Sequence, residues 1–183
     1  MRLFTGIGIP YKVRRNLELL LAHLKPTASI RWSRLENLHI TTKFIGEWPE
    51  DKLDEVKNVL RAMPHPSPFP VSIAGLGWFP NPHSPRIFWC GIQAEPLAEL
   101  AANTEEALAP IGIAKENRPY SPHLTLARIE SPGDLFPLKK AVAGLPSADF
   151  GRFTAEQFSL YLSKPGPGGS AYTILESYPL GNE

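Results

Sequence analysis

The sequence has one cysteine, almost no net charge and no long hydrophobic run. The single cysteine, Cys90, excludes an intrachain disulfide and a CxxC site, and it agrees with a reducing cytoplasm. Nineteen Lys and Arg against eighteen Asp and Glu leave a formal charge of +1, too little for a field that grips long nucleic acids. No apolar run approaches the roughly 20 residues that span a bilayer, and residues 1–10 lack a signal-peptide core. We therefore expect a cytoplasmic protein without membrane contacts.

Motifs typical of metal sites, phosphate loops and serine nucleophiles are also absent. The five histidines include no HExxH or HxxxH pair, which the commonest zinc sites would require. The chain contains neither GxxxxGK[ST] nor GxSxG. Cys90 lies in the apolar run 87–92, which is typical of a small buried residue rather than a nucleophile. We expect no metal and no cofactor.

The residues that are present predict one globular domain over residues 1–183. The composition of 43% hydrophobic and 20% charged residues is that of an ordinary folded protein. Apolar positions at helical spacing follow Pro10, Pro49 and Pro96, and a weaker helix is predicted from about Asp134 to Ala143. Strand-like runs cover residues 3–9, 38–45, 71–79, 86–92, 123–129, 153–162 and 171–178. Residues 80–85 and 164–169 read as hairpin turns.

The order of these elements repeats along the chain. Pro96 lies 86 positions after Pro10, and His123 lies 84 positions after His39. Two matched offsets predict an internal duplication. We expect an α+β fold with two pseudo-symmetric lobes, each an antiparallel-rich sheet backed by helices, and a central active-site cleft.

Each repeat carries a His-x-Thr motif in a predicted strand. The motifs are His39-x-Thr41 and His123-x-Thr125. Because residues i and i+2 of a strand point to the same face, each histidine shares a face with its threonine. The apolar neighbours take the core side, so we expect the motif residues to line the cleft. The alternative is that both are surface histidines on ordinary strands.

These motifs resemble those of the two-histidine (2H) phosphoesterase superfamily. More narrowly, the chain resembles the RNA 2′,3′-cyclic phosphodiesterases, also called 2′-5′ RNA ligases, of the LigT-like branch. The resemblance covers nearly the whole chain, with matching segments at residues 2–4, 31–32, 38–46, 75–80, 118–128 and 166–172. Thr42 departs from the branch, which more often has an aliphatic residue there.

The resemblance implies metal-independent hydrolysis of a 2′,3′-cyclic phosphate to a 2′-phosphomonoester. His39 would donate a proton to the leaving 3′-oxygen, and His123 would accept one from water, although the sequence alone could not assign the two roles. Imidazoles with a pKa near about 6.5 suit both tasks at neutral pH. Thr41 and Thr125 would donate hydrogen bonds to the phosphate oxygens. The reverse reaction would form a 2′-5′ bond.

Phe44, Arg128 and Tyr120 are the candidate substrate-binding residues. Phe44 and Arg128 each follow their histidine by five positions, and they suit stacking or charge contacts with a nucleotide. A regular strand would turn both to the core face. We therefore expect a bulge or strand end to redirect Arg128, while Phe44 suits core packing equally well. A surface salt bridge is the alternative for Arg128. Trp32 is predicted to be a packed aromatic residue.

The expected partners are RNA termini or nucleotides with a 2′,3′-cyclic phosphate, such as tRNA halves, bound by a monomer. Two alternatives stay open. The chain could bind a nucleotide or RNA end without catalysis. It could also be a 2H phosphodiesterase for another substrate, such as an ADP-ribose cyclic phosphate or a 2′-5′ oligoadenylate.

Overall fold

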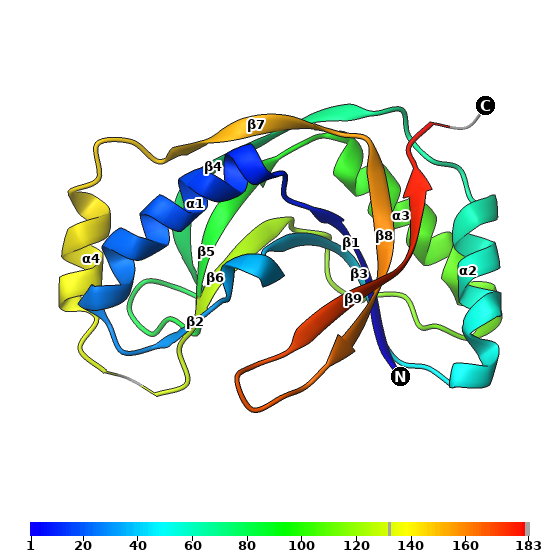
Figure 1. The fold of residues 1–183 in the computed structure, drawn as a ribbon, viewed down its shortest axis with the longest axis horizontal. Coiled ribbons are helices and arrows are strands. Elements are labelled where there is room, and N and C mark those ends of the chain that lie inside the picture. The colour runs from blue at the N-terminus through cyan, green and yellow to red at the C-terminus, as the bar shows by residue number, and fades with distance from the viewer. Residues whose placement is uncertain (132, 182–183) are drawn as a thin grey trace.

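A computed structural model describes residues 1–131 and 133–181, which form two antiparallel sheets with helices packed against them (Figure 1). The strands are β1 (Arg2–Gly8), β2 (Arg31–Trp32), β3 (His39–Glu47), β4 (Phe69–Phe79), β5 (Ile87–Gln93), β6 (His123–Arg128), β7 (Asp149–Ala155), β8 (Gln157–Lys164) and β9 (Ala171–Pro179). The helices are α1 (Tyr11–Leu24), α2 (Leu53–Ala62), α3 (Pro96–Leu108) and α4 (Phe136–Ala143), and short 3₁₀ turns flank several of them.

The strands divide into a four-stranded and a five-stranded sheet. The first sheet has the order β3-β1-β8-β9, and the second has the order β2-β6-β5-β4-β7. Neighbouring strands in both sheets pair antiparallel. The expected α+β class with antiparallel-rich sheets is confirmed, and the two predicted turns do connect β4 to β5 and β8 to β9.

The two halves of the chain exchange elements between the sheets. The C-terminal hairpin β8–β9 joins β1 and β3 in the first sheet, while β4 joins the second sheet. The helices also cross over, because α1 packs against β7 of the second sheet and α3 packs against β3 of the first. Figure 1 shows α1 with α4 on one side of the molecule and α2 with α3 on the other.

The strands differ from the sequence-based prediction at two places. The run at residues 153–162 is not one strand, because β7 ends at Ala155 and β8 starts at Gln157, with Glu156 between them. The chain passes from one sheet to the other at that point, and apolar alternation continues on both sides of the break. The two-residue strand β2 was not predicted, since a strand that short has no detectable period.

The apolar faces of the helices and strands meet in one continuous core. The apolar positions predicted for α1 are buried, namely Val13, Leu17, Leu20, Leu21 and Leu24. Cys90 is fully buried, and burial raises the pKa of its thiol to about 12, which confirms the prediction of an unreactive core residue. Among the described residues, no helix is both long and apolar enough to cross a membrane.

Candidate active site

The two histidine motifs lie on strands that meet where the sheets adjoin. β3 is the edge strand of the first sheet, and it contacts β6 of the second sheet (Figure 1). β2 pairs with Ala127 and Arg128 at the end of β6, so no strand among the described residues pairs with His123 on that side. Two edges from different sheets thereby bring together motifs that lie far apart in the sequence.

The two imidazoles make the same backbone hydrogen bond. Nδ1 of His39 donates to the carbonyl of Asn37 at 2.6 Å, and Nδ1 of His123 donates to the carbonyl of Ser121 at 3.0 Å. In both cases the acceptor lies two residues before the histidine. A carbonyl can only accept, so this bond selects the Nδ1–H form of a neutral ring and leaves Nε2 for chemistry.

The surroundings of the two histidines differ. His39 lies among aromatic rings, with centroid distances of 4.7 Å to Phe4, 5.9 Å to Tyr161 and 5.2 Å to Tyr172. Burial lowers the pKa of His39, and the hydrogen bond to Asn37 opposes that effect. His123 is exposed to solvent. The two rings therefore share the same Nδ1 hydrogen bond but differ in their exposure to solvent.

The motif threonines are half-buried beside the histidines. The hydroxyl of Thr41 donates to Nε2 of a neutral His39 at 2.8 Å. Thr125 is placed by its backbone, which pairs with Trp89 of β5. A protonated His39 would itself donate along the Thr41 bond, which frees the threonine proton. Both hydroxyls can therefore donate to a phosphate oxygen.

A β-bulge in each motif strand turns the fifth residue after the histidine outward. The β1–β3 register shifts between Thr5 and Gly6, and the β5–β6 register shifts between Phe88 and Trp89. The extra residue reverses the side-chain alternation, so Phe44 and Arg128 return to the face of the histidines. The bulge predicted for Arg128 is confirmed. Core packing of Phe44 is excluded, because its side chain is 63% exposed.

Hydrogen bonds tie each motif to the segment that precedes the other. Oγ of Ser33, which lies before the first motif, donates to the carbonyl of Thr125 at 2.7 Å. The hydroxyl of Tyr120, which lies before the second motif, donates to the carbonyl of Thr41 at 2.8 Å. We call this reciprocal pair of bonds the cross-brace. Tyr120 thus uses its hydroxyl within the protein, and its ring packs against the core.

Sequence reasoning missed the aromatic wall around His39. Phe4 stacks on Tyr161 at 4.8 Å and meets the edge of Tyr172 at 4.9 Å. Gly6 allows β1 to lie close to β3 beside His39, since a Cβ there would lie 2.6 Å from the carbonyl oxygen of Ile40 and 3.3 Å from the His39 ring. The only signal in the sequence was the aromatic content of three separate strands, which does not indicate that they converge.

Trp32 is held by packing of its ring and by one hydrogen bond of its indole N–H. The Trp32 ring packs edge-on against Phe88 at 6.1 Å, and its Nε1 donates to the carbonyl of Ala28, which confirms the predicted packed aromatic residue. Across residues 1–131 and 133–181, no three His, Cys, Asp or Glu side chains are grouped so as to hold a metal ion.

Comparison with known proteins identifies the family. Residues 7–89 and 92–172 match the family described as LigT like Phosphoesterase, and each segment contains one histidine motif. The chain belongs to this family. It is 33% identical over 178 residues to the RNA 2′,3′-cyclic phosphodiesterase of Methanocaldococcus jannaschii, covering 97% of this chain and 100% of that one. The resemblance inferred from the motifs is therefore confirmed.

Solved structures of LigT-like phosphoesterases share the whole fold. The protein TT0787 of Thermus thermophilus superposes with a TM-score of 0.84 at 29% identity, covering 98% of both chains. E. coli LigT complexed with 3′-AMP superposes with a TM-score of 0.80 at 26% identity, covering 99% of this chain and 98% of that one. The arrangement of two sheets with crossed-over helices is thus that of the family.

Proposed function

We propose that this LigT-like phosphoesterase hydrolyses the 2′,3′-cyclic phosphate of RNA ends or nucleotides to a 2′-phosphomonoester. One observation carries the proposal. Two histidines on contacting strands use the same Nδ1 bond, each followed two positions later by a threonine, and Nε2 of His39 lies 2.8 Å from the Thr41 hydroxyl. Binding alone would not need two imidazoles in matched tautomers. The names of full-length relatives in the family support the same substrate class.

The reaction needs one proton donor and one proton acceptor on opposite sides of the phosphorus. His123 takes a proton from water at Nε2 as the water oxygen forms a bond to phosphorus. The bond between phosphorus and the 3′-oxygen breaks, and His39 gives its Nε2 proton to that oxygen. Thr41 and Thr125 donate hydrogen bonds to the non-bridging oxygens. With a 5′-hydroxyl in place of water, His123 takes the proton of that hydroxyl, its oxygen bonds to phosphorus, and the 3′-oxygen leaves with a proton from His39, which forms a 2′-5′ bond.

Burial of His39 is compatible with its role as the donor once substrate is bound. In the free protein, burial lowers the pKa of His39 and favours the neutral ring. A cyclic phosphate diester is an anion, and an anion beside Nε2 favours the protonated ring. Substrate binding therefore charges the donor at the place where its proton is used.

Phe44 and Arg128 are placed to bind the nucleotide that carries the cyclic phosphate. Both side chains are exposed on the face of the histidines, and no described carboxylate pairs with Arg128. An exposed ring can stack on a base, and a guanidinium can pair with phosphate or stack. The complex of E. coli LigT with 3′-AMP supports a nucleotide at this site. One chain supplies both motifs, so we infer that a monomer is sufficient for activity. An RNA substrate also agrees with a location in the cytoplasm.

Turnover of a 2′,3′-cyclic nucleotide in excess EDTA tests the proposal. We expect the wild type to form the 2′-phosphomonoester. His39→Ala and His123→Ala should each lower kcat by about 10²–10⁴-fold, the usual contribution of a positioned acid or base. His83→Ala is the matched control, because His83 is exposed in the β4–β5 turn. Wild-type rates in both motif variants would refute the mechanism. Tight binding without product would favour the non-catalytic alternative.

A further inference from the structure

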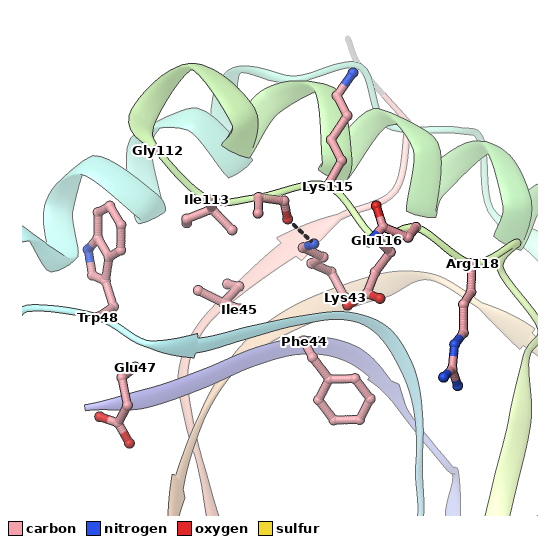
Figure 2. A pocket seen from close by; sticks show the side chains of 12 residues that line it. Lys43, Phe44, Ile45, Glu47, Trp48, Gly112, Ile113, Lys115, Glu116 and Arg118 are labelled. Carbon is pink, nitrogen blue, oxygen red and sulfur yellow. Dashed lines mark hydrogen bonds between the residues drawn. The ribbon is translucent and has the colours of Figure 1, made fainter.

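A pocket of about 640 Å³ lies along β3, beyond Phe44 and away from the motif residues. One wall is residues 43–48, from β3 to Trp48, and the other is residues 112–118, which lead from the end of α3 towards β6. Figure 2 shows the ring of Phe44 and the guanidinium of Arg118 at one end, and Trp48 with Gly112 at the other. Its volume lies within the range of about 300–1,000 Å³ typical of ligand pockets. Phe44 therefore belongs both to the proposed nucleotide site and to this pocket.

The two walls are held together by a buried cation. Lys43 is 3% exposed, and its Nζ donates to the carbonyl of Ala114 at 2.8 Å, the dashed contact in Figure 2. The same Nζ lies 2.8 Å from Glu105 of α3. The other oxygen of Glu105 accepts a hydrogen bond from the backbone N–H of Glu116 at 3.1 Å. The pocket is thus preformed, since its loop wall is fixed to β3 and to α3 at two points.

The pocket is lined by three cations, Lys43, Lys115 and Arg118, and by two carboxylates, Glu47 and Glu116. Lys43 pairs with Glu105, and Lys115 pairs with Glu106. Arg118 is exposed, and no acceptor among the described residues engages its guanidinium. Guanidinium groups bind phosphate with two parallel hydrogen bonds. The free cation lies at the Phe44 end, where the pocket meets the proposed site.

We infer that this pocket binds the nucleotide on the 5′ side of the cyclic-phosphate terminus, with Arg118 on the phosphate that links the two nucleotides. The inference rests on the proposed function, which places the terminal nucleotide against Phe44. Phe44 and Arg118 both line this pocket, so a nucleotide chain that continues past the ring on this side meets the free guanidinium. The enzyme's preferred substrate is accordingly an oligonucleotide of at least two residues rather than a cyclic mononucleotide.

Comparison of two substrates tests this subsite. We expect kcat/KM for the dinucleotide ApA with a 2′,3′-cyclic phosphate to exceed that for cyclic 2′,3′-AMP by about tenfold in the wild type. Arg118→Ala should reduce this ratio to near one, while Arg118→Lys should retain part of it, because lysine keeps the charge but loses the two-pronged hydrogen bonding. Arg152→Ala, which removes an exposed arginine from β7, should leave the ratio unchanged.

A binding measurement separates this inference from the proposed function. The ratio of Kd values for 2′-AMP and for ApA with a terminal 2′-phosphate needs no turnover, and we expect the same dependence on Arg118. Hydrolysis of neither substrate would refute the proposed function, and the binding ratio would still decide the subsite. Equal Kd values of the two ligands for the wild type would overturn the inference. So would an equal loss of affinity for both ligands in Arg118→Ala.

Discussion

His39 and His123 illustrate how the same side chain acquires different properties at two positions. Both donate Nδ1–H to a carbonyl two residues earlier, so the two neutral rings share one tautomer. Only His39 is enclosed by Phe4, Tyr161 and Tyr172. Desolvation disfavours the charged ring, which is why the pKa of His39 falls. The aromatic wall therefore sets the protonation of one histidine without changing its geometry.

The lowered pKa of His39 predicts a characteristic pH dependence. His39 must be protonated to act as the donor, so kcat/KM should fall as the pH rises through the pKa of His39. Because burial lowers that pKa in the free protein, this limb of the kcat/KM profile should lie on the acidic side of about 6.5. The anionic substrate favours the charged ring, so the corresponding limb of the kcat profile should lie at higher pH. Rates of hydrolysis of cyclic 2′,3′-AMP between about pH 4 and pH 9 give both profiles. This range includes the pH values at which imidazoles titrate. A limb at the same pH in both profiles would contradict the prediction.

At the scale of the elements, the bulges and the cross-brace arrange the motifs. The bulges place Phe44 and Arg128 on the reactive face, which a regular strand would not do. The cross-brace then joins the backbone of β3 to the segment before β6, and that of β6 to the segment before β3. The cross-brace supplies hydrogen bonds between the two motif regions, because β3 and β6 belong to different sheets and share no ladder.

Removing one bond of the cross-brace should slow catalysis without weakening binding. A hydrogen bond contributes about 1 kcal/mol, so we expect Tyr120→Phe and Ser33→Ala each to lower kcat about fivefold, with KM within about twofold of the wild type. Ser33→Thr should restore kcat, since it retains the hydroxyl. Tyr11→Phe and Ser67→Ala, which change exposed hydroxyls, are the controls. A rise in KM with unchanged kcat would argue against positioning.

The whole molecule is organised by the exchange of elements between its two sheets. α1 packs on the second sheet and α3 on the first, so each half of the chain covers strands of the other. The C-terminal hairpin completes the first sheet beside β1. Each segment that matches the family contains one motif, and the internal duplication stays a prediction. A molecule interlocked in this way should unfold as one unit.

The ion pair between Lys43 and Glu105 should contribute to the stability of the whole molecule. It joins the edge strand of the first sheet to α3 in the core. Lys43→Met leaves a largely buried carboxylate without its cation, so we expect the free energy of unfolding to fall by about 3 kcal/mol. Lys43→Met/Glu105→Leu should lose less, because no charge is left unpaired.

Chemical denaturation monitored by tryptophan fluorescence measures these differences. Lys115→Met is the control, because its ion pair with Glu106 is exposed, at 49% and 73% for the two side chains, and exposed pairs contribute about 0–1 kcal/mol. Equal losses for Lys43→Met and Lys115→Met would show that burial of the pair is unimportant.

Local pattern was enough to predict most elements and the four motif residues. Helices and strands have periods that appear in the sequence, and His39-x-Thr41 and His123-x-Thr125 share a face because alternate strand residues do. The bulge at Arg128 was predictable too, because a buried, unpaired guanidinium is costly. These inferences need only neighbours within a few residues.

The tertiary structure decided whatever depends on contacts between distant segments. The aromatic wall, the cross-brace and the pocket beyond Phe44 join residues that are separated by tens of positions. The crossing of β7 into β8 was missed because apolar alternation reports burial on one face and not which sheet supplies it. Sequence alone therefore determined the two motifs and the prediction that they do the chemistry, and packing between the sheets decided how their side chains are solvated, oriented and brought together.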